Sequence, residues 1–198
     1  MLLVVCPKAV LGPILFVMFI NDIEEGVCSN LLKFADDTTL FCKVGTNEDC
    51  SSLKSDLRLL YKWSVDWQML FNLDKCKIMQ FGYNKPMHTF LLGGQILETV
   101  SEEKDLGIMV RNDLKVFSQC IKVVKTANQV LGMIKRTITH KTKKNLLHLY
   151  KSLVRPHLEY CLQVWRPYLK KDIDLLEEVQ RRATKMILDG INAVTKSD

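Results

Sequence analysis

The sequence predicts an α+β protein, and three observations support this fold class. Short apolar segments bounded by turn residues indicate strands, and they fall at 31–42, 75–82, 88–100 and 104–110. Beyond residue 115, apolar residues recur at helical spacing, which indicates packed helices. The charge also divides, because residues 1–100 carry 9 Lys and Arg against 11 Asp and Glu, whereas residues 101–198 carry 19 against 11. The sequence therefore predicts a strand-and-helix first half and an all-helical, basic second half.

The composition is that of a globular protein and excludes several classes. Hydrophobic residues make up 47% of the 198 residues and charged residues 25%, which excludes wholesale disorder. The 7 cysteines form no Cys-x-x-Cys pair, and the 4 histidines do not complete a zinc pattern with them. Isolated thiols of this kind are typical of a reducing compartment. The basic second half suits a polyanionic partner, although a solvated helical surface is the simpler explanation of the charge alone.

The N-terminal segment is apolar but lacks the features of a signal peptide or membrane anchor. It has no basic n-region, Lys8 interrupts it, and no small-residue cleavage site follows. The apolar run over 9–20 is too short to span a bilayer and contains Pro13. We expect a buried strand-turn-helix segment, its helix running from Gly12-Pro13 to about Glu24. We also expect an intracellular protein, in the nucleus or cytoplasm, that is not secreted and has no membrane partner.

The stretch LLKFADDTTLFC, residues 31–42, predicts a β-hairpin with two adjacent carboxylates at its tip. Asp36 and Asp37 lie between two apolar arms, where Asn-Gly or Asp-Gly is more usual. Like charges side by side repel by about 1 kcal/mol in water. The pair is explained either by a solvated acidic turn or by a site for a divalent cation.

The longest amphipathic helix is predicted to begin after Thr46, which forms a capping box with Asp49. The predicted buried face of this helix consists of Leu53, Leu57, Leu60, Ser64 and Trp67. Its predicted solvent-exposed face consists of Lys54, Arg58 and Lys62. Trp63 and Trp67 are i,i+4 neighbours, and we expect a core or interface role for them rather than base stacking.

Three strand segments are predicted to follow this helix. KCKIMQFG, residues 75–82, alternates as a strand does. HTFLLGGQILETV predicts a hairpin turning at Gly93-Gly94, because both glycines tolerate positive φ. KDLGIMV, residues 104–110, predicts one further strand.

The remaining segments read as three helices. The core-facing residues of the first are predicted to be Ile121, Val124, Ala127, Leu131 and Ile134, and those of the second Leu146, Leu149, Tyr150 and Leu153. Pro156 is predicted to break the second helix. Asp172 or Asp174 is predicted to cap the last helix, which carries Leu175, Val179, Ala183 and Met186.

Five segments in this order resemble the reverse transcriptases of non-long-terminal-repeat (LINE-type, jockey-like) retrotransposons. They are VLGPILFVMFINDI, LLKFADDTTLF, WQMLFNLDKCKIMQFG, EEKDLGIMV and LYKSLVRPHLEYCLQVW, and the likeness runs from about residue 7 to residue 187. The resemblance implies an RNA-directed DNA polymerase lineage. It further implies that residues 1–114 are the C-terminal part of a right-hand polymerase palm and that residues 115–198 are a basic, all-helical thumb.

The resemblance also implies roles for particular residues. Asp36 would ligate both catalytic Mg²⁺ ions with Asp37 in support, which favours the cation-site explanation of the acidic pair. Lys75, with Asn72, matches a motif whose lysine aids the departing pyrophosphate, although a surface lysine at the start of a strand explains it equally well. The implied partners are an RNA template, a DNA primer and deoxynucleoside triphosphates.

The implied thumb would hold the primer–template duplex by its phosphates. The densest basic patches comprise Lys135, Arg136, Lys141, Lys143 and Lys144 in one segment and Arg181, Arg182 and Lys185 in another. Leu106-Gly107 resembles the turn of the family's primer-grip hairpin, with a simple core strand as the alternative.

Two departures from the family pattern bear on activity. PKAVLGP, residues 7–13, stands where the family has PQGSVLGP, a loop that lines the nucleotide and template pocket. The fingers and the strand with the third catalytic carboxylate would precede residue 1, and Asp22 is assigned a structural role. We therefore expect weak Mg²⁺ binding, no polymerase activity of the isolated chain, an open sheet edge beside 31–42 and exposure within 9–20. The alternatives are a non-catalytic nucleic-acid-binding remnant and a pseudogene product with no selected role.

Overall fold

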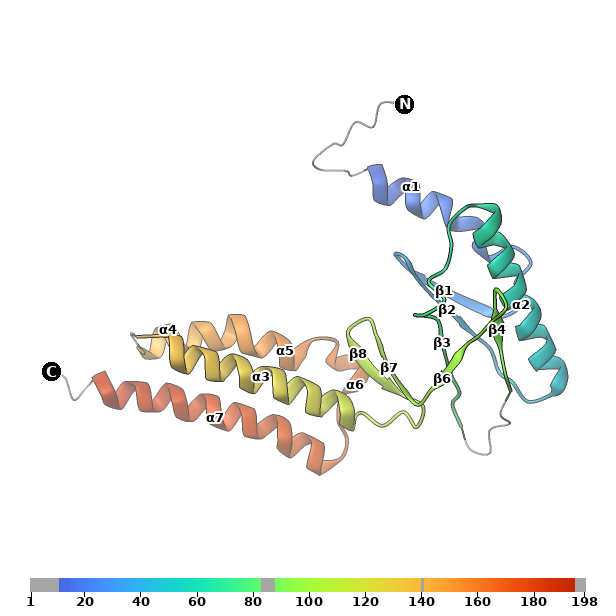
Figure 1. Ribbon diagram of the computed structural model, residues 1–198. Coiled ribbons are helices and arrows are strands. Elements are labelled where there is room, and N and C mark those ends of the chain that lie inside the picture. The colour runs from blue at the N-terminus through green and yellow to red at the C-terminus, as the bar shows by residue number, and fades with distance from the viewer. Residues whose placement is uncertain (1–10, 83–87, 140, 195–198) are drawn as a thin grey trace. The chain divides into compact units, whose positions relative to one another are not determined.

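The computed structural model describes residues 11–82, 88–139 and 141–194 (Figure 1). These residues combine helices with short strands, the strands all lie before residue 112, and the elements that follow are helical, which confirms the α+β class. The described chain forms two compact units, the first from residues 11–78 and 88–99 and the second from 79–82 and 100–194. The palm and thumb boundary predicted at residue 114 stays a prediction.

The first unit begins with an apolar helix that leaves much of its surface exposed. Helix α1 (Leu11–Phe19) ends five residues before Glu24, and a 3₁₀ turn, η1 (Asn21–Glu24), completes the predicted segment. Ile20 and Ile23 are buried, but four large apolar residues are more than half exposed, namely Ile14, Leu15, Val17 and Met18. The expectation of a buried segment is wrong for these four, and the expectation of exposure within 9–20 is confirmed.

The predicted hairpin at 31–42 is confirmed. Strands β1 (Asn30–Phe34) and β2 (Asp37–Phe41) pair antiparallel, with Phe34 opposite Asp37 and a two-residue turn between them. Leu31 and Leu40 lie on the face that packs against Leu60 of the following helix. Among the described residues, β1 and β2 pair only with each other, so both outer edges are open there.

Helix α2 (Asn47–Asp66) begins as predicted. The Asp49 carboxylate accepts hydrogen bonds from the backbone N–H groups of Gly45 and Thr46, both at 2.8 Å, and these bonds lower the pKa of Asp49. Leu60 and Ser64 are buried as predicted, whereas Trp67 is 46% exposed. Its ring instead packs edge-on against Phe19, with ring centroids 5.2 Å apart.

Asp56 of α2 is buried, although the sequence pattern assigned it no role. It is 1% exposed. Its carboxylate accepts hydrogen bonds from the backbone N–H of Cys28 at 3.0 Å and of Ser29 at 2.9 Å, and from the Ser29 hydroxyl at 2.5 Å. These bonds connect α2 to the residues directly before β1, and so hold the helix against the β1–β2 hairpin.

Replacing Asp56 with alanine is expected to lower the free energy of unfolding by about 3 kcal/mol, because three donors lose the buried carboxylate that accepts their hydrogen bonds. Asp56→Asn keeps one acceptor oxygen and should lose less. Asp66→Ala, at an exposed position of the same helix, serves as the control and should change stability by less than about 0.5 kcal/mol. Urea unfolding followed by tryptophan fluorescence measures the difference. Equal midpoints for Asp56→Ala and the control would refute this role.

Two further predicted strands form a short pair and a tight hairpin. Strand β3 (Lys77–Met79) pairs with β6 (Glu98–Val100). Strands β4 (Leu91–Leu92) and β5 (Gln95–Ile96) flank the predicted turn at Gly93 and Gly94, whose φ angles are +59° and +85°. Both angles lie in the left-handed region that a two-residue type I′ turn needs, and this is why glycine occupies both positions.

The second unit begins with a hairpin where the sequence predicted one strand. Strands β7 (Glu102–Asp105) and β8 (Ile108–Arg111) pair antiparallel around Leu106 and Gly107, whose φ angles are +43° and +89°. The single-strand prediction is wrong because the Leu-Gly turn interrupts the apolar run. Residues 106 and 107 therefore form the turn of a hairpin and not part of a simple core strand, and the primer-grip role stays a prediction.

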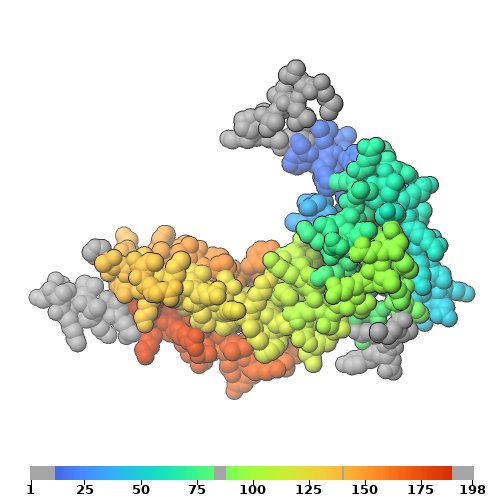
Figure 2. Space-filling view, in the orientation of Figure 1, coloured from blue at the N-terminus to red at the C-terminus, as the bar shows by residue number. Residues whose placement is uncertain are grey.

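Helical segments make up the rest of the second unit. They are α3 (Phe117–Thr137), α4 (Lys143–Leu149), the π-helical turn η2 (Tyr150–Val154), α5 (Arg155–Glu159), α6 (Leu162–Trp165) and α7 (Lys170–Val194). Helices α3 and α7 lie side by side (Figures 1 and 2). No helix within the described residues is long and apolar enough to cross a membrane.

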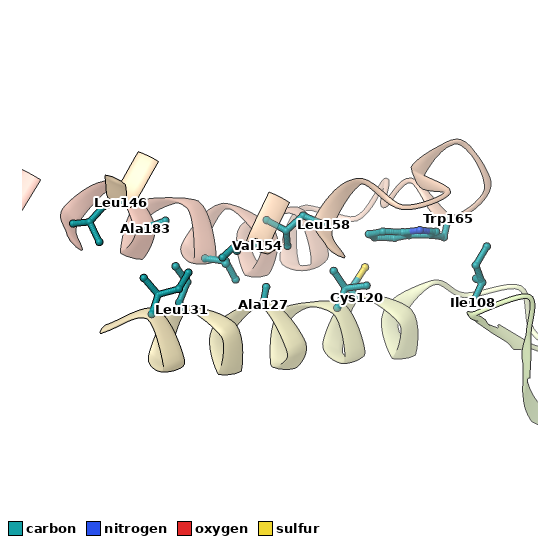
Figure 3. Packing of buried hydrophobic residues seen from close by; sticks show 12 residues of the cluster. Ile108, Cys120, Ala127, Leu131, Leu146, Val154, Leu158, Trp165 and Ala183 are labelled. Carbon is teal, nitrogen blue, oxygen red and sulfur yellow. The ribbon is translucent and has the colours of Figure 1, made fainter. Parts of the chain in front are cut away.

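These helices enclose the larger hydrophobic core (Figure 3). The predicted core residues Ala127, Leu131, Ile134, Leu146, Val179 and Ala183 are all buried. Ile121 is 45% exposed and Leu153 is 40% exposed, so these two predictions are wrong. Their neighbours Cys120 and Val154 face the core instead. For Val154 the reason is the π turn, which changes the helical phase by widening one turn.

Two predicted helix boundaries are also wrong. Pro156 does not end the second helix, because helical structure continues from η2 into α5, and Pro156 lies in the first turn of α5. Helix α7 begins at Lys170, so neither Asp172 nor Asp174 is its cap. Asp172 instead lies in the first turn and is buried.

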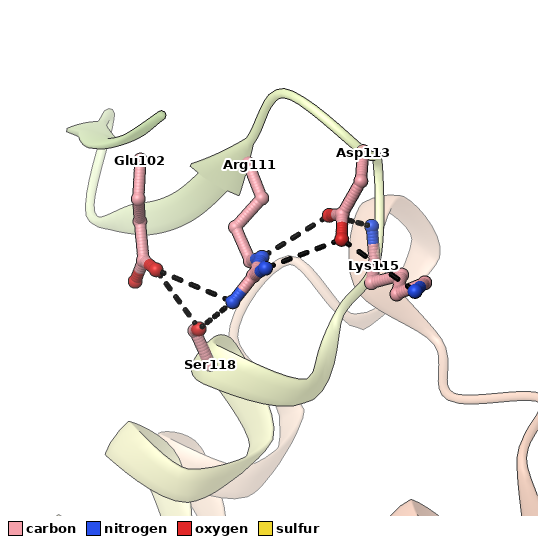
Figure 4. A network of polar contacts seen from close by, with 5 residues as sticks. All are labelled: Glu102, Arg111, Asp113, Lys115 and Ser118. Atoms are coloured by element: carbon pink, nitrogen blue, oxygen red, sulfur yellow. Dashed lines mark hydrogen bonds and ion pairs between the residues drawn. The ribbon is translucent and has the colours of Figure 1, made fainter. Parts of the chain in front are cut away.

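A polar network joins β8 to the start of α3 (Figure 4). The Arg111 guanidinium donates to both carboxylate oxygens of Asp113, at 3.1 and 3.2 Å, and to the Ser118 hydroxyl at 3.4 Å. Ser118 in turn donates to Glu102 at 3.0 Å. Arg111 lowers the pKa of Asp113, so the network persists to more acidic pH than an isolated aspartate would allow.

Candidate catalytic hairpin and nucleic-acid interface

Asp36 and Asp37 lie at the tip of the β1–β2 hairpin, as the sequence predicted. Asp36 is the second residue of the turn, and Asp37 is the first residue of β2. Ala35, the first turn residue, has a φ of +52°, a conformation that costs a non-glycine residue about 1 kcal/mol or more. Both carboxylates are exposed, and neither forms a hydrogen bond or ion pair with any described residue. The hairpin tip therefore presents two unneutralised negative charges.

Exposed apolar side chains share a strand face with Asp37. Residues directly opposite each other in the register share a face, so the side chain of Asp37 lies beside that of Phe34. Leu32, two residues before Phe34 in β1, lies on the same face. Phe34 is 63% exposed and Leu32 is 61% exposed. Asp36 precedes β2 within the turn, so its side chain leaves the backbone in a different direction from that of Asp37.

The donor set at the tip fits part of a magnesium site. Carboxylate oxygens are the protein ligands that Mg²⁺ prefers, and Mg²⁺ keeps several waters when one or two carboxylates bind it. Within the described ranges, no group of three or more Asp, Glu, His or Cys side chains converges on one point. Asp36 can therefore supply one ligand of such a site, with Asp37 in a supporting position.

Lys75 lies in a turn that ends one residue before β3. Its backbone N–H donates to the Asn72 carbonyl at 3.0 Å, and its side chain is exposed. The described contacts do not bring Lys75 to Asp36 or Asp37. The structure thus holds Asn72 and Lys75 together in one turn and leaves the role of the lysine as a prediction.

Five of the predicted nucleic-acid-binding residues gather where α3 ends and α4 begins. Lys135 and Arg136 lie in the last turn of α3, Lys141 lies in the connection, and Lys143 and Lys144 lie in the first turn of α4. All five are exposed, and we call them the α3–α4 basic patch. Positive charge in the first turn of α4 opposes the helix dipole, and no acidic residue there offsets it. This arrangement leaves the charge available to an external anion.

The basic residues of α7 are more fully neutralised. Arg181 forms an ion pair with Glu177 at 2.7 Å, and Arg182 pairs with Glu178 and donates to the Asn128 side chain at 3.2 Å. Lys185 is exposed on the same helix. Ion pairs at i,i+4 compete with phosphate for the guanidinium groups, so the α3–α4 basic patch is the stronger candidate.

The turn of the β7–β8 hairpin is held by two side chains of the second unit. The Tyr160 hydroxyl donates to the Leu106 carbonyl at 3.1 Å, and the Lys122 ammonium donates to the Gly107 carbonyl at 2.9 Å. Burial lowers the pKa of Lys122. The Tyr160 ring lies 3.3 Å from the position that a Cβ at residue 107 would occupy. The sequence pattern missed both side chains, because they contact the turn from distant parts of the chain.

Comparison with known proteins decides the family. A family profile described as reverse transcriptase (RNA-dependent DNA polymerase) matches residues 9–133. The chain belongs to the reverse transcriptase family. It is also 24% identical, over 194 residues and 90% of its length, to the RNA-directed DNA polymerase from mobile element jockey of Drosophila melanogaster. The LINE-type, jockey-like resemblance is therefore confirmed.

This reverse transcriptase chain spans about a fifth, 21%, of the jockey polymerase. No solved structure matches it. The family match contains the acidic hairpin tip, Lys75 and the β7–β8 hairpin, and it ends within α3. The α3–α4 basic patch lies beyond that match but within the described second unit. The predicted loop at 7–13 begins outside the described residues.

Proposed function

We propose that this chain supplies the catalytic hairpin of an RNA-directed DNA polymerase, with Asp36 binding both catalytic metal ions and Asp37 supporting one of them. The observation that carries the proposal is the pair of unneutralised carboxylates at the tip of a two-residue hairpin, inside the region that matches the family. The substrates would be a DNA primer, an RNA template and deoxynucleoside triphosphates.

The residues at the tip would position the reacting groups. Bound Mg²⁺ would supply charge neutralisation and activation of the primer hydroxyl. The Asp36 oxygens would fix where that charge lies, and the strained Ala35 turn holds Asp36 at the tip. Lys75, exposed in its turn, would donate charge or a proton to the departing pyrophosphate.

Residues 1–114 would then act as palm and residues 115–198 as thumb. The β7–β8 hairpin, tied down by Tyr160 and Lys122, would support the primer strand. The α3–α4 basic patch, with Arg181, Arg182 and Lys185 of α7, would contact phosphates of the primer–template duplex.

Transplanting residues 30–41 into the jockey polymerase, in place of the segment aligned with them, tests the proposed activity. We expect the graft to retain RNA-templated primer extension, because the turn and the acidic pair carry the local geometry. A soluble graft that binds primer–template but extends no primer would refute the catalytic assignment.

The isolated chain, in contrast, is expected not to extend a primed RNA template above background in Mg²⁺ or Mn²⁺. Adjacent aspartates point in different directions, so at most one is directed fully into a metal site. A misplacement of about 1 Å can cost roughly 100-fold in rate. Asp36→Asn should therefore be indistinguishable from the parent in a gel-based extension assay. Extension by the purified parent that disappears in Asp36→Asn would contradict this expectation, with Asp22 the first additional ligand to test.

A non-catalytic nucleic-acid-binding role is the second candidate. It is favoured by the α3–α4 basic patch, which belongs to a unit with its own hydrophobic core. Salt-dependent duplex binding by the chain, together with a failed hairpin graft, would support this role over catalysis.

A further inference from the structure

A pocket of about 360 Å³ lies in the first unit, between α2 and the β4–β5 hairpin. Helix α2 and β4 contact one another there. Its lining residues are Lys54, Arg58 and Tyr61 of α2, Leu91 of β4, and Gly93 and Gly94 of the turn. None of these residues belongs to the β1–β2 hairpin, so the pocket is formed by different elements from the proposed catalytic tip.

One wall of the pocket is cationic. Lys54 and Arg58 are one helical turn apart, and neither forms an ion pair with a carboxylate of the described residues. The Lys54 ammonium instead lies 5.8 Å from the centre of the Phe90 ring. Asp56, the acidic residue between them in sequence, is buried against Ser29 on another face of α2. Two positive charges therefore line the pocket without a local counter-ion.

The rest of the lining is largely apolar, and the β4–β5 turn contributes no side chains to it. The Tyr61 ring, which also belongs to α2, packs against the backbone of Gly93 so closely that a Cβ there would lie 2.2 Å from a ring carbon. Nothing lies within 4 Å of the Cβ position of Gly94, so that side of the turn is open. Leu91 adds a half-exposed aliphatic surface. A flat, weakly polar ring therefore has room on the open side of the turn, beside Leu91, while a charged group on the same ligand reaches Lys54 and Arg58.

We propose that this pocket binds a nucleotide unit of single-stranded nucleic acid, with its phosphate between Lys54 and Arg58 and its base against Tyr61 and Leu91. A guanidinium and an ammonium both donate strong, charge-assisted hydrogen bonds to phosphate oxygens. Protein grooves that bind single-stranded nucleic acid combine positive charge with aromatic surface. Lys62 is exposed one further turn along α2, outside the pocket. With Lys54 and Arg58 it forms a row of cations along the helix. Such a row suits a ligand with several phosphates in succession, such as an oligonucleotide, better than a free mononucleotide. This site goes beyond the proposed polymerase function and does not depend on Asp36 or Asp37.

Photocrosslinking of the full chain tests the site. The probe is a short single-stranded oligonucleotide of 4-thiouridine, and crosslinked peptides are mapped by mass spectrometry. We expect crosslinks at Tyr61 or within 91–94, because the base lies against these residues. The double variant Lys54→Gln, Arg58→Gln should lose about tenfold of this crosslinking, since two charge-assisted phosphate contacts disappear. A second probe, 4-thiouridine monophosphate, should crosslink there much less than the oligonucleotide.

The control variant Lys43→Gln, Lys125→Gln removes the same charge from exposed positions outside the pocket and should crosslink there like the parent. Far-UV circular dichroism checks that all variants fold. Absence of crosslinks at Tyr61 and 91–94 in the parent would overturn the proposal whatever the variants do. Equal loss in the pocket and control variants, or crosslinking by the monophosphate but not the oligonucleotide, would overturn it as well. Crosslinks that occur only at the α3–α4 basic patch would also overturn the proposal.

Discussion

Asp36→Asn in the jockey polymerase that carries residues 30–41 is expected to reduce RNA-templated primer extension about 1000-fold or more. Asparagine keeps the size of the side chain and one acceptor oxygen but removes the negative charge that would hold two divalent ions. Because those ions would neutralise charge that develops at the reacting phosphate, the loss should appear in kcat rather than in the KM for the nucleotide. Asp37→Asn should reduce extension less, since Asp37 is assigned to only one ion.

Thr39→Ser provides the matched control for this experiment. Thr39 is exposed on β2, two residues from Asp37, and it carries no charge. The control graft should extend the primer like the parent graft. If Asp36→Asn and Thr39→Ser extended equally well, Asp36 would not be a metal ligand, and the acidic pair would be a solvated turn.

Neutralising the α3–α4 basic patch is expected to produce the second large effect. Replacing its five cations with glutamine should weaken duplex binding and make the plot of log affinity against log salt concentration shallower. Each phosphate contact contributes about 0.9 to that slope on duplex DNA, so the slope should fall by about 4 if most of the five contact phosphates. Fluorescence anisotropy with labelled duplex DNA over a salt series measures it, and an RNA–DNA hybrid should behave similarly.

A matched control removes five exposed lysines from elsewhere in the second unit, namely Lys104, Lys115, Lys125, Lys151 and Lys170. If net charge alone determined binding, both variants would show the same slope. The thumb assignment requires a clearly larger change for the α3–α4 basic patch. An affinity that does not depend on salt would exclude phosphate contacts altogether.

Features that depend on a few neighbouring residues could be predicted from the sequence. The capping box of Thr46 and Asp49 is local, because both hydrogen bonds close within one turn. The glycine pair at 93–94 fixes its own turn through positive φ. The hairpin at 31–42 was also predicted, although its turn uses Ala35 in a conformation that alanine adopts rarely.

Features that depend on distant partners could not be predicted. The sequence alone would place the charged Asp56 in solvent. Its burial is favourable because hydrogen-bond donors of residues 28 and 29 contact its carboxylate. The π turn at 150–154 changes the helical phase, so a regular 3.6-residue period assigned Leu153 to the core in place of Val154. Lys122 reaches the β7–β8 turn from α3 and Tyr160 from the turn after α5, and no spacing in the sequence marks these contacts.

The candidate site divides in the same way. The acidic pair is contiguous, so its residues were found directly. The clustering of the α3–α4 basic patch could also be predicted, because its residues occupy one segment that joins two helices, and its role in binding nucleic acid stays a prediction. The pocket beside α2 could not be predicted, because the sequence pattern assigns Lys54 and Arg58 only to the solvent-exposed face of the helix. The pocket becomes visible when the fold brings the β4–β5 turn next to these two residues.

Metal-directed cleavage of this chain tests the central claim most directly. Fe²⁺ replaces Mg²⁺ at carboxylate sites, and with ascorbate and peroxide it cuts the backbone near its ligands. At millimolar Fe²⁺, which compensates for weak binding, we predict cleavage at residues 35–38 that is lost in the Asp36→Asn, Asp37→Asn double variant. Cleavage that concentrates at other acidic residues and leaves the hairpin tip intact would contradict the assignment of Asp36 and Asp37 as metal ligands.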